Sequence, residues 1–132
     1  MHQIFKIVSN MKELKVFYKK NIPFKGYCAI TLFDCMIIRE DCRDKVGKRT
    51  YNHESIHQAQ SRDFGLGFCG YFIFYFLYLL EWILKLPWAL FGYKTYESIS
   101  FEREAYIRDC DFSYLEKRKR FAWVKYIFKM IK

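Results

Sequence analysis

The stretch TYNHESIHQAQ, residues 50–60, contains an H-E-x-x-H pattern. Thr50 or Asn52 can cap the start of a helix that we expect to continue to about Asp63, with Gly65 as its stop. Two histidines one helical turn apart share a helix face, and this spacing is typical of a metal site. The stretch therefore predicts a metal-binding helix around which the other elements are arranged.

Three side chains of this predicted helix have distinct expected roles. His53 and His57 lie four positions apart, so both imidazoles can point at one ion. Glu54 stands beside them, where its carboxylate can take a proton from a water molecule that attacks a carbonyl group. These residue types indicate zinc-dependent hydrolysis with Glu54 as general base. The alternative is that both histidines are ordinary half-buried residues paired with nearby acids.

A site with two histidines needs a third protein ligand, and a second predicted helix can supply it. The sequence SISFEREAYIRD, residues 98–109, has serines at its start and acids in its first turn. Glu102, Tyr106 and Asp109 fall at i, i+4 and i+7 on one stripe. We expect Glu102 to be the metal ligand, although a first-turn acid is also favoured by the helix dipole. Tyr106 or Asp109 would hydrogen-bond a ligand imidazole or the reacting oxygen, whereas Glu104 points elsewhere.

The two motifs together resemble those of a known peptidase family. HESIH followed by EREAY is similar to the paired motifs of the gluzincin zinc metallopeptidases, in particular the membrane-associated branch with HtpX-like and prenyl-protein (CAAX) proteases. The resemblance implies that His53, His57 and Glu102 hold zinc. It also implies that Glu54 is the general base for peptide hydrolysis.

This chain departs from that family pattern at one position. The second motif of the family is similar to E-x-x-A-D, and Tyr106 stands where that pattern has an acid. The departure shifts the supporting role toward Asp109. The whole chain also resembles small, uncharacterised zincin-like proteins of bacteria.

Between the motifs lies a strongly apolar segment, residues 64–90, in which Phe64 to Leu80 runs for 17 residues without a charge. A single membrane crossing there would put the two motifs on opposite sides of the bilayer, so a span and the zinc site exclude each other. We favour a core or interfacial helix broken at Pro87. Its expected sides are a tyrosine edge with Tyr71, Tyr75, Tyr78, Trp82 and Lys85, and an apolar face with Ile73, Phe76, Leu77, Leu80, Ile83 and Leu84.

Shorter patterns predict the remaining elements. Apolar residues at spacings of three and four within the first twenty positions favour an amphipathic helix that Pro23 stops. Residues 27–38 favour a β-hairpin, and residues 39–48 a charged loop. Residues 114–131 predict a basic amphipathic helix, which either docks on the core or lies on an anionic membrane surface.

Composition limits the class of protein. The chain has 132 residues, 52% of them hydrophobic, and a formal net charge of +9, so we expect one ordered domain over residues 1–132. Five cysteines without a CxxC pair, and an N-terminus without a signal-like apolar stretch, predict reduced, buried cysteines and a cytoplasmic location. The basic ends lack any nucleic-acid-binding motif, so nucleic acid is not an expected partner.

Together these patterns predict a mostly helical α+β fold, a minimal zincin-like domain with a β-hairpin before the metal-binding helix. The expected function is zinc-dependent hydrolysis of a peptide or protein substrate, at the inner membrane surface if the basic and aromatic segments contact lipid. One alternative is a non-catalytic membrane-surface or protein-interaction module in which the metal helix is structural or inactive. Another is a helical membrane anchor with incidental histidines.

Overall fold

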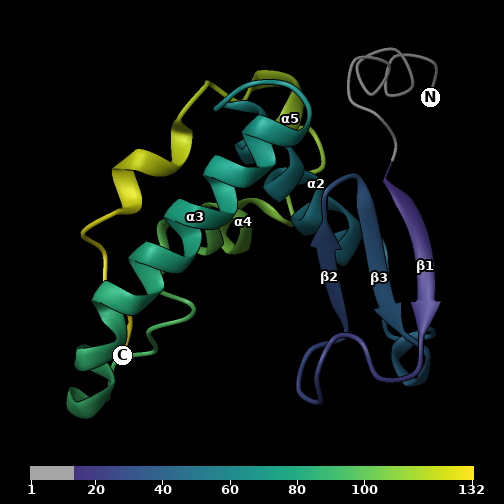
Figure 1. Cartoon of the computed structure of the whole chain (residues 1–132), viewed down its shortest axis with the longest axis horizontal. Helices are drawn as coiled ribbons and strands as arrows, with labels where there is room; N and C mark the ends of the chain where they lie inside the picture. Colours follow the sequence, from purple (N-terminus) through teal and green to yellow (C-terminus); the bar gives the residue numbers. More distant parts are fainter. Residues whose placement is uncertain (1–13) are drawn as a thin grey trace.

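A small β-sheet lies on one side of the molecule and a group of helices on the other (Figure 1). The computed structural model describes residues 14–132. The sheet contains strands β1 (Lys15–Lys19), β2 (Ala29–Leu32) and β3 (Cys35–Arg39) in the order β1-β3-β2. The predicted class, α+β and mostly helical, is confirmed.

Strands β2 and β3 form the predicted hairpin, with Phe33 and Asp34 in its two-residue turn. Phe33 has a φ of 57°, the left-handed conformation that such a tight turn requires. The backbone amide of Arg39 donates to the carbonyl of Cys28 at 2.9 Å, so alternate residues of β2 turn their peptide groups away from β3. Ala29 is one of these, and within residues 14–132 no strand pairs with that outer edge.

The predicted N-terminal helix is wrong where the structure describes it, because residues 15–19 form β1 instead. The sequence there is KVFYK, with three β-favouring residues in a row, and it pairs in parallel with β3. Leu14 just before it is buried with Met36 and Ile38. Strand pairing and this small core outweigh the weak helical spacing. The rest of the predicted helix lies outside the described residues.

Helix α2 (Lys48–Arg62) carries the first motif and begins earlier than predicted. Gly47, not Thr50 or Asn52, precedes its first turn. The Asn52 side chain instead donates to the backbone carbonyl of Asp109 at 2.9 Å, which ties α2 to the end of another helix. The charged loop before α2 is confirmed from residue 40 onward and contains one 3₁₀ turn, η2 (Glu40–Cys42).

Helix α3 (Phe68–Lys85) continues as the 3₁₀ segment η3 (Leu86–Phe91), so the predicted break at Pro87 is confirmed. By length and composition, Phe68–Phe91 passes the test for a membrane-spanning helix, although a core helix can pass the same test. The polypeptide then turns back along α3 into α4 (Ser100–Arg108), the second motif helix (Figure 1). A close approach between α2 and α3 depends on Gly70, because a Cβ there would meet the backbone oxygens of Gly65 and Ser61.

The structure reverses the expected burial of α3 for a core helix. Its tyrosine edge packs inward, with Tyr71 buried, whereas much of the apolar face, including Phe76 and Leu84, is exposed. The buried side packs with Phe101 of α4 around Phe74. The predicted pair of Glu81 and Lys85 is confirmed at 2.6 Å.

The predicted helix over residues 114–131 is wrong. The chain instead forms two short segments, α5 (Tyr114–Lys117) and η4 (Ala122–Tyr126), separated by Phe121 in a left-handed conformation. Arg118 between them is buried in ion pairs with Asp63 and Glu104. Trp123 packs against Phe101 at 4.5 Å between ring centroids. These tertiary contacts overrule the helical spacing.

The prediction of reduced, buried cysteines is also corrected. Cys28 and Cys42 form a disulfide that joins the start of the hairpin to the turn after it. Cys69 and Cys110 are free and exposed, and Cys35 is partly buried. The two cysteines are 14 residues apart in the sequence, and only the folding of the hairpin brings them together. The cytoplasmic location loses this part of its support and stays a prediction.

Candidate metal centre

Helices α2 and α4 bring the three predicted ligands together. The Nε2 atoms of His53 and His57 lie 3.2 Å apart. His53 Nε2 is 3.2 Å from one carboxylate oxygen of Glu102, and His57 Nε2 is 3.1 Å from the other. Within residues 14–132, these are the three residues grouped closely enough to hold a metal ion. The sequence prediction of this cluster therefore agrees with the geometry.

The spacing of the two imidazole nitrogens fits a tetrahedral zinc ion. Zinc binds imidazole nitrogen and carboxylate oxygen at about 2.0–2.2 Å, which places neighbouring ligand atoms about 3.3–3.6 Å apart. The Nε2 atoms of His53 and His57 are 3.2 Å apart, close to that edge length, and each of them lies 3.1–3.2 Å from a different oxygen of Glu102. One possible ligand atom from each of the three residues lies within 4.8 Å of the other two. Three protein ligands also leave the fourth position open, as catalytic zinc sites do.

The second nitrogen of each histidine has an acceptor of its own. His57 Nδ1 lies 2.8 Å from Gln60 Oε1, and His53 Nδ1 lies 3.4 Å from Asp109 Oδ2. The Gln60 amide nitrogen donates to Glu104 and to the carbonyl of Phe101, both at 2.9 Å, which fixes the amide orientation. With its proton on Nδ1, each imidazole presents Nε2 to the cluster, the arrangement that supports metal ligands.

The Glu102 carboxylate is held by two phenols. Tyr78 of α3 donates to its Oε1 at 2.7 Å, and Tyr96 donates to the same oxygen at 3.1 Å. Burial and the neighbouring charge of Glu102 raise the pKa of both tyrosines well above the ordinary value, so both remain donors. The hydrogen bond from Tyr78 to Glu102 therefore links α3 to α4 at the predicted metal ligand.

Electrostatic interactions stabilise His57 and Glu102 as a buried pair of opposite charges. Burial alone would lower the pKa of His57, but the charge of Glu102 and hydrogen bonding to it raise the pKa to about 9. Burial alone would raise the pKa of Glu102, but His57 and His53 hold it well below the usual range. A cation is therefore favoured at this carboxylate.

Glu54 stands apart from the three ligands but faces the same cavity. Its Oε2 accepts a hydrogen bond from Thr31 Oγ1 of β2 at 2.5 Å. This places a buried carboxylate next to the cluster without making it a fourth ligand, since Glu54 is outside the grouped atoms. Such a position suits a group that exchanges protons with a water molecule at the open site.

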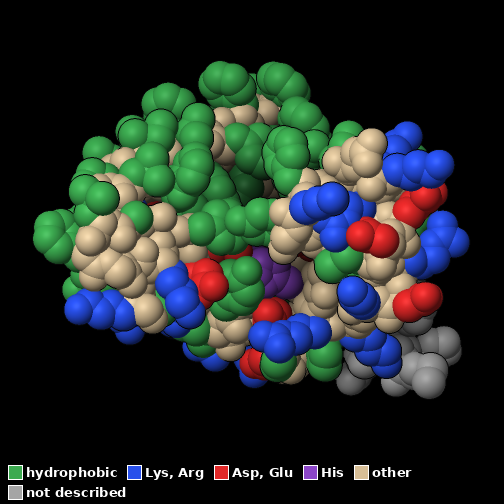
Figure 2. Space-filling model, turned by 90° about the horizontal axis from the view of Figure 1, so that it is seen from below, with side chains coloured by type: hydrophobic (Ala, Val, Ile, Leu, Met, Phe, Trp, Pro, Cys, Tyr) green, Lys and Arg blue, Asp and Glu red, His purple; other side chains and the backbone are tan. Residues whose placement is uncertain are grey.

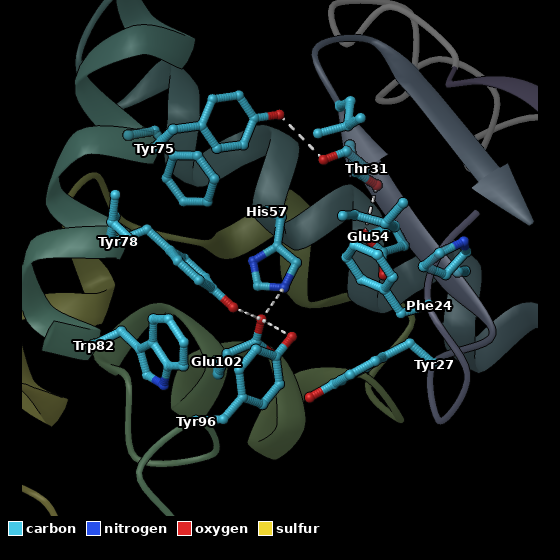
Figure 3. A pocket seen from close by; sticks show the side chains of 16 residues that line it. Phe24, Tyr27, Thr31, Glu54, His57, Tyr75, Tyr78, Trp82, Tyr96 and Glu102 are labelled. Atoms are coloured by element: carbon cyan, nitrogen blue, oxygen red, sulfur yellow. Dashed lines mark hydrogen bonds and ion pairs between the residues drawn. The ribbon is translucent and has the colours of Figure 1, made fainter. Parts of the chain in front are cut away.

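A cavity of about 560 Å³ opens between α3 and the hairpin, and His57 and Glu102 of the cluster are part of its lining (Figure 3). Thr31 and Glu54 add further polar groups to this lining. The rest of its wall is mostly aromatic and aliphatic, with Tyr75, Tyr78, Leu79 and Trp82 from α3 and Phe24, Tyr27 and Ile30 from the other side. A volume of this size accommodates a bulky apolar group beside the cluster.

The remaining predicted site residues lie close to the cluster in different ways. Asp109 contacts His53, as expected, and also accepts from Arg49 at 2.9 Å. The Tyr106 ring lies edge-on to the His53 ring, with 4.7 Å between centroids. Burial and the charge of Glu102 raise the pKa of Tyr106 to about 12. Its expected catalytic role stays a prediction. Glu104 points away from the cluster, as predicted.

Sequence reasoning missed four supporting residues: Thr31, Gln60, Tyr78 and Tyr96. Gln60 follows His57 by three positions, a spacing that puts both on one helix face, so this contact was accessible from the sequence. Tyr78 belongs to the tyrosine edge, but only the packing of α3 on α4 brings its hydroxyl to Glu102. No pattern in the sequence pointed to Thr31 or Tyr96 as supporting residues.

No protein-family model, curated protein or solved structure matches this chain.

Proposed function

We propose that the chain is a zinc-dependent metallopeptidase that hydrolyses peptide bonds. The observation that carries the proposal is the cluster of His53, His57 and Glu102, together with Glu54, which lines the same cavity as His57 and Glu102. The H-E-x-x-H spacing supplies two ligands and a general base from one helix, and the opposite helix supplies the third ligand. A bound zinc ion would polarise the substrate carbonyl and make water more acidic.

The chain's own groups divide the remaining work. Glu54 accepts the proton of the attacking water. Thr31 of β2 donates a hydrogen bond to the Glu54 carboxylate and so holds it in place. The Glu54 carboxylic acid can then pass this proton to the leaving amine. Gln60 and Asp109 orient the two imidazoles, and Tyr78 orients Glu102.

The outer edge of β2 offers a place for an extended substrate. Its outward peptide groups at Ala29 lie beside the cavity and can pair with a peptide main chain. Farther along the same edge, the Tyr75 hydroxyl donates to the Thr31 carbonyl at 3.1 Å and accepts from the Phe33 amide at 2.8 Å. Tyr75 therefore limits how far a peptide can extend along the strand.

The rival function is a structural metal clip without catalysis. A clip needs a fourth protein ligand to close the site. In the described part of the chain, the group of possible ligands contains only His53, His57 and Glu102, and Asp109 contacts the outer nitrogen of His53. This arrangement favours an accessible fourth position.

The test compares wild type with Glu54→Gln after both are loaded with one equivalent of zinc. A mixture of fluorescence-quenched peptides with varied apolar residues serves as substrate. We expect Glu54→Gln to retain zinc and to lose about two to four orders of magnitude in cleavage rate. Glu116→Gln, which changes an exposed acid that does not line the cavity, should cleave like wild type. Equal cleavage by wild type and Glu54→Gln would contradict the proposed mechanism.

A further inference from the structure

The outer side of α3 and η3 forms a long apolar surface, which we call the apolar ridge: the exposed side chains of Phe68–Phe91. Phe72, Phe76, Ile83 and Leu90 are among its exposed residues. Figure 2 shows hydrophobic side chains gathered along one side of the molecule, around a hollow. A surface patch of this extent marks a contact site.

The ridge contains no exposed charge. The two charged residues of Phe68–Phe91, Glu81 and Lys85, have side chains only 13% and 10% exposed and turn inward. Lys85 donates to the Ser98 carbonyl, and Glu81 accepts from the Ser100 amide and hydroxyl. Protein interfaces of useful size carry about one hydrogen bond per 100–200 Å². A surface that offers almost no polar group matches lipid better than a protein partner.

The inner side of the same helix carries polar groups along its whole length, on both sides of the buried Phe74. Tyr71 in the first turn donates to Asp34, Tyr78 in the middle to Glu102, and Lys85 in the last turn to Ser98. These contacts extend over about 21 Å of helix at 1.5 Å per residue. A crossing helix would put such groups at every depth of the bilayer. A helix with apolar groups along one side and polar groups along the opposite side instead suits a position in the membrane plane.

Basic residues stand at one end of this surface and across the cavity from it. The Lys132 Nζ atom lies 5.1 Å from the centroid of the Tyr93 ring. The Tyr93 ring in turn packs edge-on to Trp88 of the ridge, with 6.1 Å between ring centroids. On the far side of the cavity, Lys25 follows Phe24, which is 84% exposed. Cations next to exposed aromatic residues complement anionic lipid headgroups, each contributing about 1 kcal/mol near such a surface.

We propose that the protein docks on an anionic lipid bilayer through the apolar ridge, with α3 parallel to the membrane plane. Leu79 and Trp82 belong to the ridge and also line the cavity, so the cavity mouth opens beside the docked surface. A substrate segment at the membrane surface then reaches the cluster without leaving the interface. This last consequence rests on the proposed function, whereas the docking itself does not.

Flotation with lipid vesicles tests the docking. The probes are vesicles of phosphatidylcholine alone and of phosphatidylcholine with one quarter phosphatidylglycerol. Wild type should float with the anionic vesicles and more weakly with the neutral ones. The triple variant Phe72→Ser, Phe76→Ser, Ile83→Ser should lose at least about tenfold in affinity, because it removes three apolar side chains from the contact.

The matched control is Phe112→Ser, which removes an aromatic side chain exposed to nearly the same extent, 59% against 61% for Phe76, but outside the ridge. It should float like wild type. All of these side chains are exposed, so circular dichroism should show the same fold in each variant. Binding that is equal in wild type and the triple variant, or no vesicle binding at all, would overturn the proposal.

Depth measurements separate a docked helix from a spanning one. A fluorophore is attached at one end of α3 or the other in a chain that carries Cys35→Ser and Cys110→Ser: at Cys69, or at Leu84→Cys with Cys69 also replaced by serine. Brominated lipids labelled near the headgroup should quench both positions equally. Quenching of one position by shallow labels and of the other only by deep labels would establish a span instead and overturn the proposal.

Two further outcomes are informative. If wild type forms a dimer in solution that the triple variant abolishes, and does not float, the ridge is covered by a second copy and the proposal fails. The flotation of Glu54→Gln and of metal-stripped protein should equal that of wild type. Docking can therefore succeed or fail separately from the proposed peptidase activity.

Discussion

Gln60 accepts a hydrogen bond from His57 at 2.8 Å, and its amide nitrogen donates to Glu104 at 2.9 Å. A buried acid outside the cluster of His53, His57 and Glu102 thus fixes the orientation of the His57 imidazole through a single amide. Glu104 is fully buried and also bonds Arg118 and Tyr114. The rigidity of the cluster therefore depends on a polar network behind it.

Replacing Gln60 should weaken zinc binding without touching a ligand. Gln60→Leu removes the acceptor at His57 Nδ1 while keeping a similar volume, and we expect zinc affinity to fall about 10- to 100-fold. Competition with a chromogenic chelator measures it. Ser55→Ala on the same helix removes only a hydroxyl that bonds the Tyr51 carbonyl, so it is the control. Equal affinities in the two variants would remove the role assigned to Gln60.

Asp109 should support His53 in the same way. Asp109→Asn keeps the shape of the side chain but removes the charge that faces His53 and Arg49. We expect zinc affinity to fall about tenfold or more in the same competition assay. Asp111→Asn changes a neighbouring acid that bonds Ser113 and Lys117. It should bind zinc like wild type, and a similar loss there would point to a general charge effect.

The ion cluster of Arg118 should dominate the stability of the C-terminal segment. Arg118→Met leaves Asp63 and Glu104 buried without their cation, and removal of one partner from such a cluster costs about 3–5 kcal/mol. Urea unfolding of the metal-free protein measures the free energy. Lys117→Met alters an adjacent, largely exposed lysine and should change it by less than about 0.5 kcal/mol. A small effect of Arg118→Met would mean that the cluster contributes little.

Gly70 should tolerate no side chain. A Cβ there would lie 2.2 Å from the Gly65 oxygen and 2.7 Å from the Ser61 oxygen, so Gly70→Ala must push α3 away from α2. We expect a loss of about 1–3 kcal/mol in the free energy of unfolding. Gly47→Ala meets no atom within 4 Å and should cost less than about 1 kcal/mol. Similar costs at both positions would argue against this close approach.

Local spacing predicted the centre of the site well. His53 and His57 share a face wherever residues 50–60 are helical, and Glu102 faces them once a second helix packs alongside. The hairpin was equally clear, because β-favouring residues flank a two-residue turn at Phe33 and Asp34. In these cases a short pattern determines the local structure.

Spacing failed where distant partners decide the structure. Residues 15–19 become a strand because β3 is available to pair with them. The C-terminal segment is extended around Arg118 because Asp63 and Glu104, both far away in the sequence, pair with it. The hydroxyls of Tyr78 and Tyr96 reach Glu102 only through packing. None of these partners can be identified from periodicity.

Metal content, measured by elemental analysis, tests the central claim most directly. Wild type and His57→Ala are purified without added zinc, dialysed against one equivalent of zinc and analysed for bound metal. We predict about one zinc per chain in wild type and a loss of stoichiometric zinc in His57→Ala, since two remaining ligands hold zinc poorly. Wild type without zinc after this treatment, or His57→Ala with as much zinc as wild type, would contradict a metal centre at His53, His57 and Glu102.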